Sequence, residues 1–464
     1  MSIQNNNNTS IAVPTRQRAL VLQGGGALGA YDAGVFQALY DKIDTSDGRP
    51  LFDIIAGTSS GAMNAAILVS NVIEKGWDYA ARNLNEFWDY VATVPYIQNT
   101  PAFSIWWANL HAMNPNAASE EAARRYYSAK QFQFTGVQNV FSSPILRPDL
   151  KFFDDTIPWP VYSNQPLKDS LEKYARFPIA TSSDLNQPRL LLTTVDVQES
   201  TTVTFDSYVK EDGTRKSEYG NKNGKYQYVI NYDQGITSDF AIASGSVAIN
   251  YDYARIPTIT VDNNNNLQTV ERYFWDGGIL SNTPLRELIQ AHQDYWLNVK
   301  GKGRDGAQIP QLDIYIVDVW PTKIKDIPMD HDGVIDRYFD LLLDDKTDYD
   351  EIVANIVSDY IDFVKQTRDL AVEAINTITD ASKKNTLQKK LEKILKIKAK
   401  SIQRTGEQRT YQDLLKGRFS MNVTRIDRTD NVNDISNKLS DYSTDTLREL
   451  RQDGYNDTLK VIQK

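Results

Sequence analysis

The beginning of the chain alternates short apolar runs with segments of helical spacing. Residues 18–22 form an apolar run that ends in glycines, and residues 31–40 follow with apolar positions three and four apart. A second apolar run at 52–56 precedes small residues at 62–68. Apolar runs of about four to eight residues bounded by turn signals are typical of buried strands. The pattern therefore predicts two consecutive strand–turn–helix units.

Regular patterns return after residue 185 and continue to the end of the chain. We predict strands at 189–197, 201–208, 312–319 and 421–426, and a hairpin of 257–261 with 267–275 around an asparagine-rich turn. We predict helices at 237–247, 285–296, 350–378, 387–402 and 444–462. Strands that alternate with helices indicate an α/β protein.

The pattern loosens between residues 83 and 165, where aromatic side chains cluster and prolines recur. This composition predicts an irregular cap. Its rings either form a core of their own or line an apolar channel for an acyl chain, because sites for apolar ligands are concave and mostly apolar. The two interpretations are compatible.

Composition and charge exclude several classes of protein. The chain of 464 residues carries a net charge of −9, which disfavours nucleic acid as the main partner. It has no cysteine, so disulfides, zinc–thiolate sites and cysteine nucleophiles are excluded. No apolar run approaches the roughly 20 residues of a membrane span. Residues 1–16 lack the regions of a signal peptide, and we expect a disordered tail. We expect a cytoplasmic or peripheral membrane protein, with export without a signal peptide left open.

The turn between the second strand and its helix is a candidate nucleophile site. Ser59 lies between Gly57 and Gly61, directly after the apolar run. A serine on such a sharp turn projects its hydroxyl from the top of a sheet, and the flanking glycines remove Cβ clashes. An ordinary turn of small residues remains the alternative.

The glycine stretch after the first strand has three interpretations. Gly24, Gly26 and Gly29 have the spacing of a dinucleotide fingerprint, which also requires an acidic residue at the end of the second strand. Here that strand ends in the serine turn, and its only acid, Asp53, lies at its beginning. A tight structural turn is the second interpretation. The third, which we favour, is a loop whose backbone N–H groups hold an anion beside Ser59.

A serine nucleophile requires a base, and an aspartate is the better candidate. Asp276 follows the second strand of the predicted hairpin and precedes Gly277 and Gly278, which clear space around it. None of the histidines, His111, His292 and His331, lies in a glycine-framed turn, and we interpret them as structural or surface residues. An ordinary Asp-Gly turn is the alternative at residue 276.

Together these three stretches resemble the patatin-like phospholipase family. Residues 24–29 resemble its oxyanion loop, residues 57–61 its nucleophile elbow, and residues 276–278 its aspartate motif. The resemblance implies a Ser59–Asp276 dyad and an oxyanion hole formed by Gly24, Gly25, Gly26 and Ala27. It implies hydrolysis of phospholipids or other acyl esters through an acyl-enzyme, without a metal or cofactor.

The resemblance also implies the organisation of the chain. We expect a three-layer α/β/α fold with a central, mostly parallel sheet. The expected parts are a catalytic domain at 17–335 that includes the cap at 83–165, a helical insertion at 336–417, and a terminal strand and helix at 418–464 that complete the domain. Two positions depart from the family pattern: Leu28 stands where many members carry arginine or lysine, and Ala248 replaces a usual proline.

The helical insertion leaves the partners open. Between residues 383 and 404 the charge is almost entirely positive, with Glu392 the lone acid. A basic amphipathic helix can lie on an anionic membrane, although a charge run is usually a solvated face. Long added helices also fit a protein activator. The rival functions are a lipid- or protein-binding module that is idle without its partner, and a dinucleotide-dependent enzyme.

Overall fold

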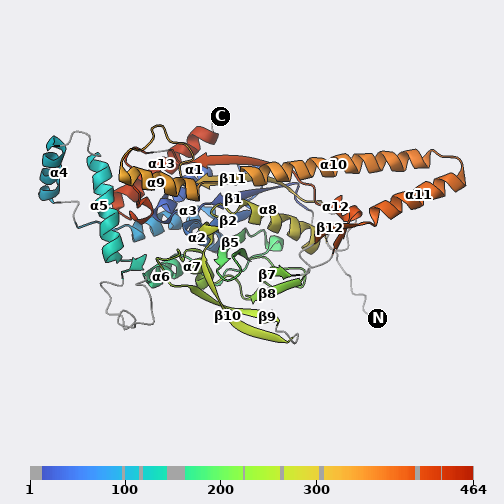
Figure 1. Ribbon diagram of the computed structural model, residues 1–464, viewed down its shortest axis with the longest axis horizontal. Coiled ribbons are helices and arrows are strands. Elements are labelled where there is room, and N and C mark those ends of the chain that lie inside the picture. The colour runs from blue at the N-terminus through green and yellow to red at the C-terminus, as the bar shows by residue number, and fades with distance from the viewer. Residues whose placement is uncertain are drawn as a thin grey trace.

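The computed structural model describes residues 13–96, 100–113, 119–143, 162–222, 225–261, 266–301, 308–402, 408–429 and 431–462. In this part of the chain, one 10-stranded sheet forms the centre of the molecule (Figure 1). Its strands lie in the order β14 (Met421–Asp427), β11 (Gln311–Asp318), β1 (Arg16–Leu22), β2 (Ile54–Thr58), β5 (Arg189–Asp196), β10 (Leu267–Asp276), β9 (Ala254–Val261), β8 (Lys225–Asn231) and β7 (Lys216–Lys222). The tenth, β6 (Thr201–Asp206), pairs with β5.

The sheet has a parallel half and an antiparallel half. Strands β14, β11, β1, β2 and β5 run parallel to one another, whereas β10, β9, β8, β7 and β6 form antiparallel pairs. The parallel half carries the two strand–turn–helix units of the N-terminal region. The hairpin of β7 and β8 was not predicted, because tyrosines, lysines and asparagines dominate both strands.

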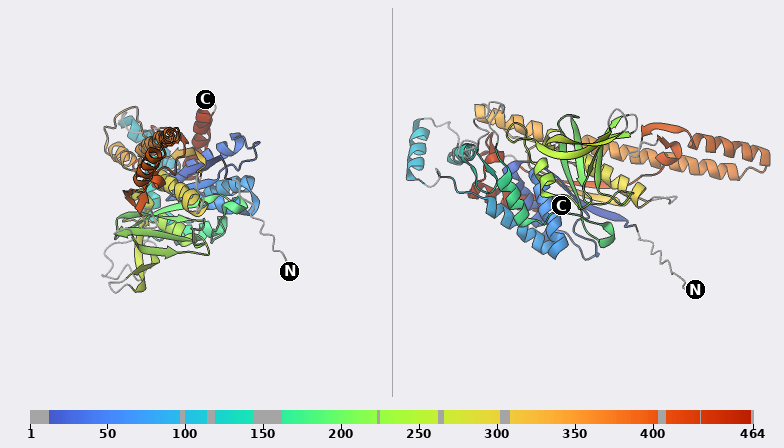
Figure 2. Two further views of the ribbon diagram at one scale, coloured as in Figure 1. Left: turned by 90° about the vertical axis from the view of Figure 1, so that its right-hand side faces the viewer. Right: turned by 90° about the horizontal axis from the view of Figure 1, so that it is seen from below.

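Helices cover both faces of the parallel half, as the expected three-layer fold requires (Figures 1 and 2). The principal helices are α1 (Gly29–Lys42), α2 (Ser60–Lys75), α3 (Trp77–Val91), α4 (Pro101–Met113), α5 (Glu120–Thr135), α6 (Gln165–Tyr174), α7 (Ser238–Ser244), α8 (Leu285–Asp294), α9 (His331–Leu343), α10 (Asp348–Asn376), α11 (Ala381–Leu395), α12 (Tyr411–Leu414) and α13 (Thr444–Ile462). The short helical turns are η1 (Gly26–Leu28), η3 (Ser183–Leu185), η4 (Gly277–Ile279), η5 (Tyr295–Val299) and η6 (Lys438–Ser440). The remaining strands are β3 (Gly136–Val137), β4 (Phe141–Ser142), β12 (Lys398–Ile402) and β13 (Gln408–Thr410).

The sequence alternation of the central strands divides the core into two layers. In β1, Leu20 and Leu22 belong to the cluster beneath α1 and α2, whereas Ala19 and Val21 belong to the cluster beneath α8. Successive side chains of a strand point to opposite faces, so a strand buried on both faces is apolar throughout. This explains why residues 19–22 form an unbroken apolar run.

Two predictions of secondary structure were wrong. The helix predicted at 387–402 ends at Leu395, and residues 398–402 form β12, paired with β13. The cap predicted as irregular contains α4, α5 and most of α3. Pro101 is the first residue of α4, where proline needs no N–H partner, so the proline marks a helix start.

Within the described residues, none of the helices is both long and apolar enough to span a bilayer.

The C-terminal helix packs against the first helix through two glycines. A Cβ atom on Gly34 of α1 would lie 1.9 Å from the carbonyl oxygen of Arg451, and one on Gly454 of α13 would lie 2.2 Å from that of Tyr31. Tyr31 also donates a hydrogen bond from its hydroxyl to the buried Asp457, at 3.1 Å. The last helix is therefore part of the main core.

We predict that Gly34→Ala lowers the free energy of unfolding by about 1–3 kcal/mol, because the added methyl group must push α13 away from α1. Chemical denaturation measures the change. Gln452→Ala on the exposed side of α13 is the control, and we expect a change within about 0.5 kcal/mol. Equal stability of Gly34→Ala and the unmodified protein would contradict the close contact.

Candidate active site

Ser59 lies at a strained turn between β2 and α2. Its φ is 55° and its ψ is −125°, outside the regions that L-residues prefer. A Cβ atom on Gly57 would lie 2.2 Å from the carbonyl oxygen of Gly61, and one on Gly61 would lie 2.3 Å from that of Leu22. Both positions therefore require glycine, and the turn is as sharp as a nucleophile elbow.

Hydrogen bonds from a neighbouring helix hold the elbow in place. The Ser59 N–H donates to the Ser244 hydroxyl at 2.9 Å, and this hydroxyl donates to the Thr193 carbonyl at 2.6 Å. Ser244 lies at the end of α7, and Thr193 lies on β5. The contact ties the turn to the next strand of the sheet. The small residues at 243–246, which end α7, allow this close approach.

Asp276 is the last residue of β10, and its side chain lies beside Ser59. Its N–H donates to the Ser246 carbonyl at 2.8 Å, and its carboxylate accepts a hydrogen bond from the Gly278 N–H at 2.7 Å. The Ser59 hydroxyl donates to the same carboxylate. A Cβ atom on Gly277 would lie 2.3 Å from the Thr193 carbonyl oxygen, so this position too requires glycine. The structure thus places the predicted nucleophile beside the predicted base.

The environment of Asp276 makes its carboxylate more basic. Burial raises its pKa from the ordinary value of 3.8 to about 6, although the hydrogen bonds from Ser59 and Gly278 favour the charged form and lower it. Its side chain is buried, and among the described residues no lysine or arginine forms a salt bridge with it. Desolvation is therefore the source of base strength that the sequence could not identify.

The glycine loop between β1 and α1 lies directly against the serine. A Cβ atom on Gly24 would lie 2.8 Å from the Ser59 Cβ atom. The Gly24 N–H approaches the Asn282 carbonyl at 3.4 Å, and the Gly25 N–H donates to the Ser60 hydroxyl at 3.0 Å. Among the described residues, the N–H groups of Gly26 and Ala27 have no hydrogen-bond acceptor. Of the four predicted donors, only these two are free to meet an anion.

The end of α9 and the turn η6 hold this loop in place. The Leu343 carbonyl accepts hydrogen bonds from the side chains of Gln23 at 3.1 Å and Asn282 at 2.8 Å. A Cβ atom on Gly26 would lie 2.5 Å from the Leu439 carbonyl oxygen, and Gly26 has a φ of 58°, which favours glycine. Residues 343 and 439 were not predicted as part of the site, because their backbone atoms make the contacts.

An ion-pair cluster joins these two segments. Lys438 of η6 is buried and lies 3.0 Å from Asp336 and 2.5 Å from Asp340, both on α9. Asp434 also faces Lys438 and pairs with Arg428 at 2.6 Å. Breaking a buried pair leaves an uncompensated charge, so the cluster fixes α9 against η6. Both elements contact the glycine loop.

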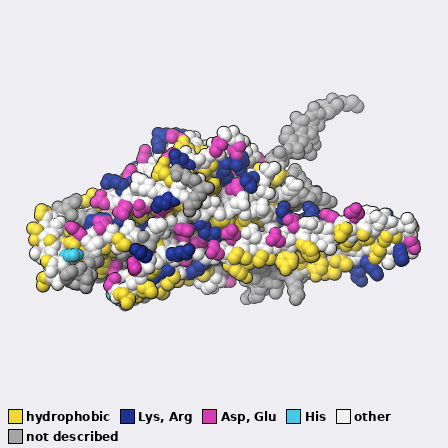
Figure 3. Space-filling view, turned by 90° about the horizontal axis from the view of Figure 1, so that it is seen from above, with side chains coloured by type: hydrophobic (Ala, Val, Ile, Leu, Met, Phe, Trp, Pro, Cys, Tyr) yellow, Lys and Arg dark blue, Asp and Glu magenta, His cyan; other side chains and the backbone are white. Residues whose placement is uncertain are grey.

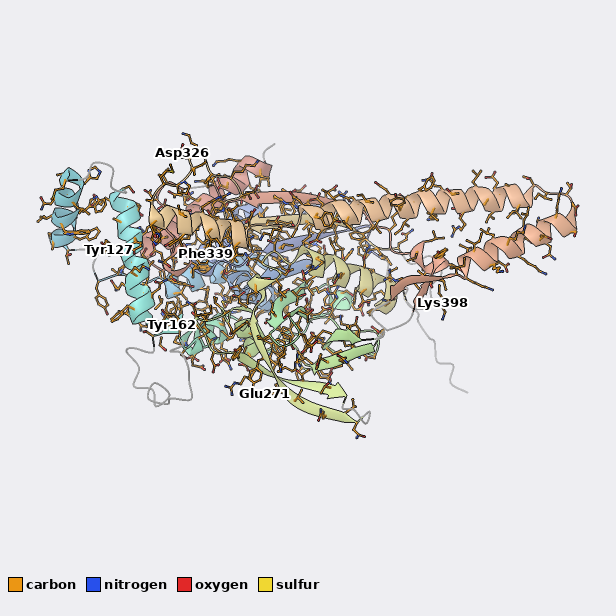
Figure 4. All side chains as sticks on the ribbon, viewed as in Figure 1. Tyr127, Tyr162, Glu271, Asp326, Phe339 and Lys398 are labelled. Carbon is orange, nitrogen blue, oxygen red and sulfur yellow. The ribbon has the colours of Figure 1, made fainter. Side chains whose placement is uncertain are left out.

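A small apolar cavity of about 70 Å³ opens at Ser59. Besides Gly26, Ser59 and Ser60, its lining includes Met63, Phe87, Trp88, Val91, Val140, Phe141, Tyr162, Leu167, Val247, Tyr251, Leu439 and Tyr442. Figure 4 marks Tyr162, which joins the cavity from the segment before α6. The cap therefore contributes rings to the site. The cap residues Trp106 and Trp107 line a separate cavity beside α9.

The remaining candidates have structural surroundings. His292 is buried, its Nε2 atom lies 2.9 Å from the Pro310 carbonyl, and burial lowers its pKa to about 3. His111 and His331 are exposed on α4 and α9. Leu28, one of the two positions that depart from the expected family pattern, is buried beside Gly25. The interpretation of the histidines is confirmed.

Comparisons with known proteins assign the chain to a family. The Patatin family model, described as patatin-like phospholipase, matches residues 20–289, more than half of the chain. No curated protein matches the sequence. VipD from Legionella pneumophila is similar at 12% identity and a TM-score of 0.29, over 97% of this chain and 67% of that chain. ExoU–SpcU, a heterodimeric complex of the type III secretion system of Pseudomonas aeruginosa, matches at 15% identity and a TM-score of 0.23, over 72% of this chain and 50% of that chain.

We predict that Asp276→Asn raises the free energy of unfolding at pH 8 by about 2–3 kcal/mol relative to the unmodified protein. The folded state binds the Asp276 proton more tightly than the unfolded chain, so ionisation costs stability as the pH rises from 3.8 through about 6. Asparagine removes this cost, and the difference should shrink to about 0.5 kcal/mol at pH 4 and vanish below the unfolded pKa.

Denaturant titrations between pH 4 and 8 measure this difference. Asp239→Asn is the control, because Asp239 is exposed and pairs only with Lys168 among the described residues. A difference that is constant with pH would contradict the raised pKa of Asp276.

Proposed function

Because the chain belongs to the patatin-like phospholipase family, we propose that it is a lipid acyl hydrolase of the phospholipase A or lysophospholipase type. The observation that carries the proposal is the pairing of Ser59 with a buried, basic Asp276 at an apolar cavity. Both residues lie inside the region that the family model matches. No cofactor enters the proposed reaction.

In the proposed first step, Asp276 accepts the hydroxyl proton as Ser59 Oγ attacks the ester carbonyl carbon. The negative charge that develops on the carbonyl oxygen is stabilised by the N–H groups of Gly26 and Ala27, which have no other acceptor among the described residues. The bond to the leaving oxygen then breaks, and Asp276 returns the proton to it. The N-terminus of α2, which begins at Ser60, adds a partial positive charge at the same place.

In the second step, water attacks the acyl-enzyme. Asp276 accepts a proton from the water, the bond to Ser59 Oγ breaks, and the serine recovers its proton. The products are a free fatty acid and a lysolipid or an alcohol. A weak base suffices because Asp276 and Ser59 are already joined by a hydrogen bond in a site with little water.

The substrate would enter by movement of the cap. The cavity of about 70 Å³ holds only a few water molecules, far less than a long acyl chain. Phe87, Trp88 and Phe141 line it from the cap side, so their displacement would open an apolar path to Ser59.

We retain the division into catalytic domain, cap, helical insertion and terminal strand and helix as part of this proposal. A protein activator remains a prediction.

We predict that Ser59→Ala and Asp276→Asn each lower the release of fatty acid from phospholipid vesicles, and of p-nitrophenol from a soluble acyl ester, by at least about a hundredfold. The exposed substitutions Ser382→Ala and Asp239→Asn are matched controls that should retain full activity. Activity that survives Ser59→Ala, with the melting temperature retained, would exclude the mechanism.

We also predict the pH dependence of the reaction. Asp276 must be unprotonated to act as the base, so kcat/KM for the soluble ester should be half-maximal near pH 6. Below that pH it should fall about tenfold per pH unit. Stopped-flow release of p-nitrophenol at pH 4.5 to 8.5 measures the profile. A half-maximal pH near 4 would mean that Asp276 is not desolvated, or is not the base.

A further inference from the structure

The pair of helices α10 and α11 projects from the body of the molecule as a hairpin (Figures 1 and 2). Helix α10 has 29 residues and is about 43 Å long at 1.5 Å per residue. None of its residues is buried in the described structure. A helix of this length outside a core requires tertiary contacts for stability, because intrinsic propensity alone is marginal. The hairpin therefore lacks the partner that its sequence implies.

One side of α10 is an exposed apolar stripe. It is formed by Tyr349, Ile352, Val353, Ile356, Val357, Tyr360, Phe363, Val364 and Leu370, which are 37% to 73% exposed. Their spacing of three and four residues places them on one face of the helix. Figure 3 shows hydrophobic side chains gathered in a row along the hairpin. The row continues for several turns of α10, which is unusual for a surface that only water contacts.

The stripe faces away from the body of the protein. Ser358 donates a hydrogen bond to the Phe419 carbonyl at 2.9 Å, and Asp362 pairs with Arg418 at 2.5 Å. These two residues are four apart and lie on the face of α10 opposite the stripe, at 100° per residue. The body thus holds α10 by its polar side. The apolar side is left open along its length.

The charges of the two helices are complementary. Helix α10 carries seven acidic and two basic residues, and α11 carries five lysines and one glutamate. The hairpin as a whole has almost no net charge, so an anionic membrane would attract α11 and repel α10 in similar measure. A second hairpin, in contrast, can place its basic helix beside the acidic helix of the first. Charge complementarity therefore favours another copy of the chain over a lipid surface.

The apolar area is also sufficient for a stable dimer. Nine large side chains that are about half exposed present on the order of 1,000 Å² of surface. A typical specific interface buries about 800 Å² on each partner. The stripe of α10, together with Leu387 and Ile394 of α11, which are also exposed, reaches this size without the body of the protein.

We propose that the α10–α11 hairpin binds the hairpin of a second copy of this chain and forms a four-helix bundle. In it the apolar stripes face each other, and α10 of each copy lies beside α11 of its partner. Such a twofold arrangement uses the same surface on both copies. The proposal does not depend on the proposed function, because it uses only the hairpin.

Sedimentation equilibrium of the full chain at 1 to 100 μM tests the proposal. We expect a mass of twice 52.6 kDa for the unmodified protein. The substitutions Ile356→Asp and Phe363→Asp place charges in the stripe, and each should weaken dimerisation by at least a hundredfold. Asn355→Asp and Gln366→Asp are matched controls, because they add the same charge to exposed positions of α10 outside the stripe. Melting temperatures monitor the folding of all four variants.

Two outcomes would overturn the proposal. One is a monomer at 100 μM, and the other is a dimer that persists in both stripe variants. Flotation with vesicles of phosphatidylglycerol and phosphatidylcholine, run on the same proteins, identifies the alternative occupant. Vesicle binding by a monomeric protein, lost in Phe363→Asp and kept in Gln366→Asp, would assign the stripe to a lipid surface instead.

Discussion

The close approach of α2 to the end of β1 is the constraint on which the site depends. Gly61 lies so near the Leu22 carbonyl that only glycine fits, and Gly57 is pressed against Gly61 in turn. This contact forces the chain to turn at Ser59 with a positive φ. It also brings the loop after β1 beside the turn after β2, so that Gly25 binds the Ser60 hydroxyl. The sharp turn at Ser59 and the position of the glycine loop beside it are thus consequences of one packing contact between adjacent parallel strands.

Burial without a counter-ion distinguishes Asp276 from Asp196 and Asp206, two buried aspartates of the sheet that are ion-paired. Asp196 binds Arg272 and Asp206 binds Arg189 through two hydrogen bonds each, so these carboxylates are neutralised and hold strands together. The pKa of Asp206 is well below its usual range, since the attraction of Arg189 and Lys210 exceeds the effect of burial. Asp276 receives only the hydrogen bonds of a hydroxyl and one N–H. Since no salt bridge to it is present among the described residues, burial raises the pKa of its carboxyl group, at a cost in stability.

Local signals predicted the parts of the fold that local geometry determines. Residues 57–61 and 276–278 combine strand ends with glycines, and the structure brings Ser59 and Asp276 together as expected. The end of α11 was predicted wrongly because apolar positions continue through Ile397 and Ile402, although residues 398–402 pair with β13. The cap helices were missed because prolines recur among their aromatic residues, whereas Pro101 in fact begins α4. Which N–H groups of the glycine loop lack an acceptor among the described residues could not be predicted either. It depends on the Ser60 hydroxyl and on Leu439, which lies more than 400 residues beyond the loop in sequence.

The contacts at the base of the hairpin connect it to the site. Arg425 on β14 pairs with Asp345 at 3.1 Å, Asp348 at 3.0 Å and Glu351 at 2.8 Å, so the start of α10 is fixed to the edge of the sheet. Two residues before Asp345, the Leu343 carbonyl binds Gln23 and Asn282 beside the glycine loop. A displacement of α10 would therefore be transmitted to the glycine loop through the few residues that connect Leu343 with the start of α10. The segment between Leu343 and Asp345 therefore connects the base of the hairpin with the glycine loop. Lys398 at the hairpin base and Tyr162 at the cavity nevertheless lie on opposite sides of the body in Figure 4.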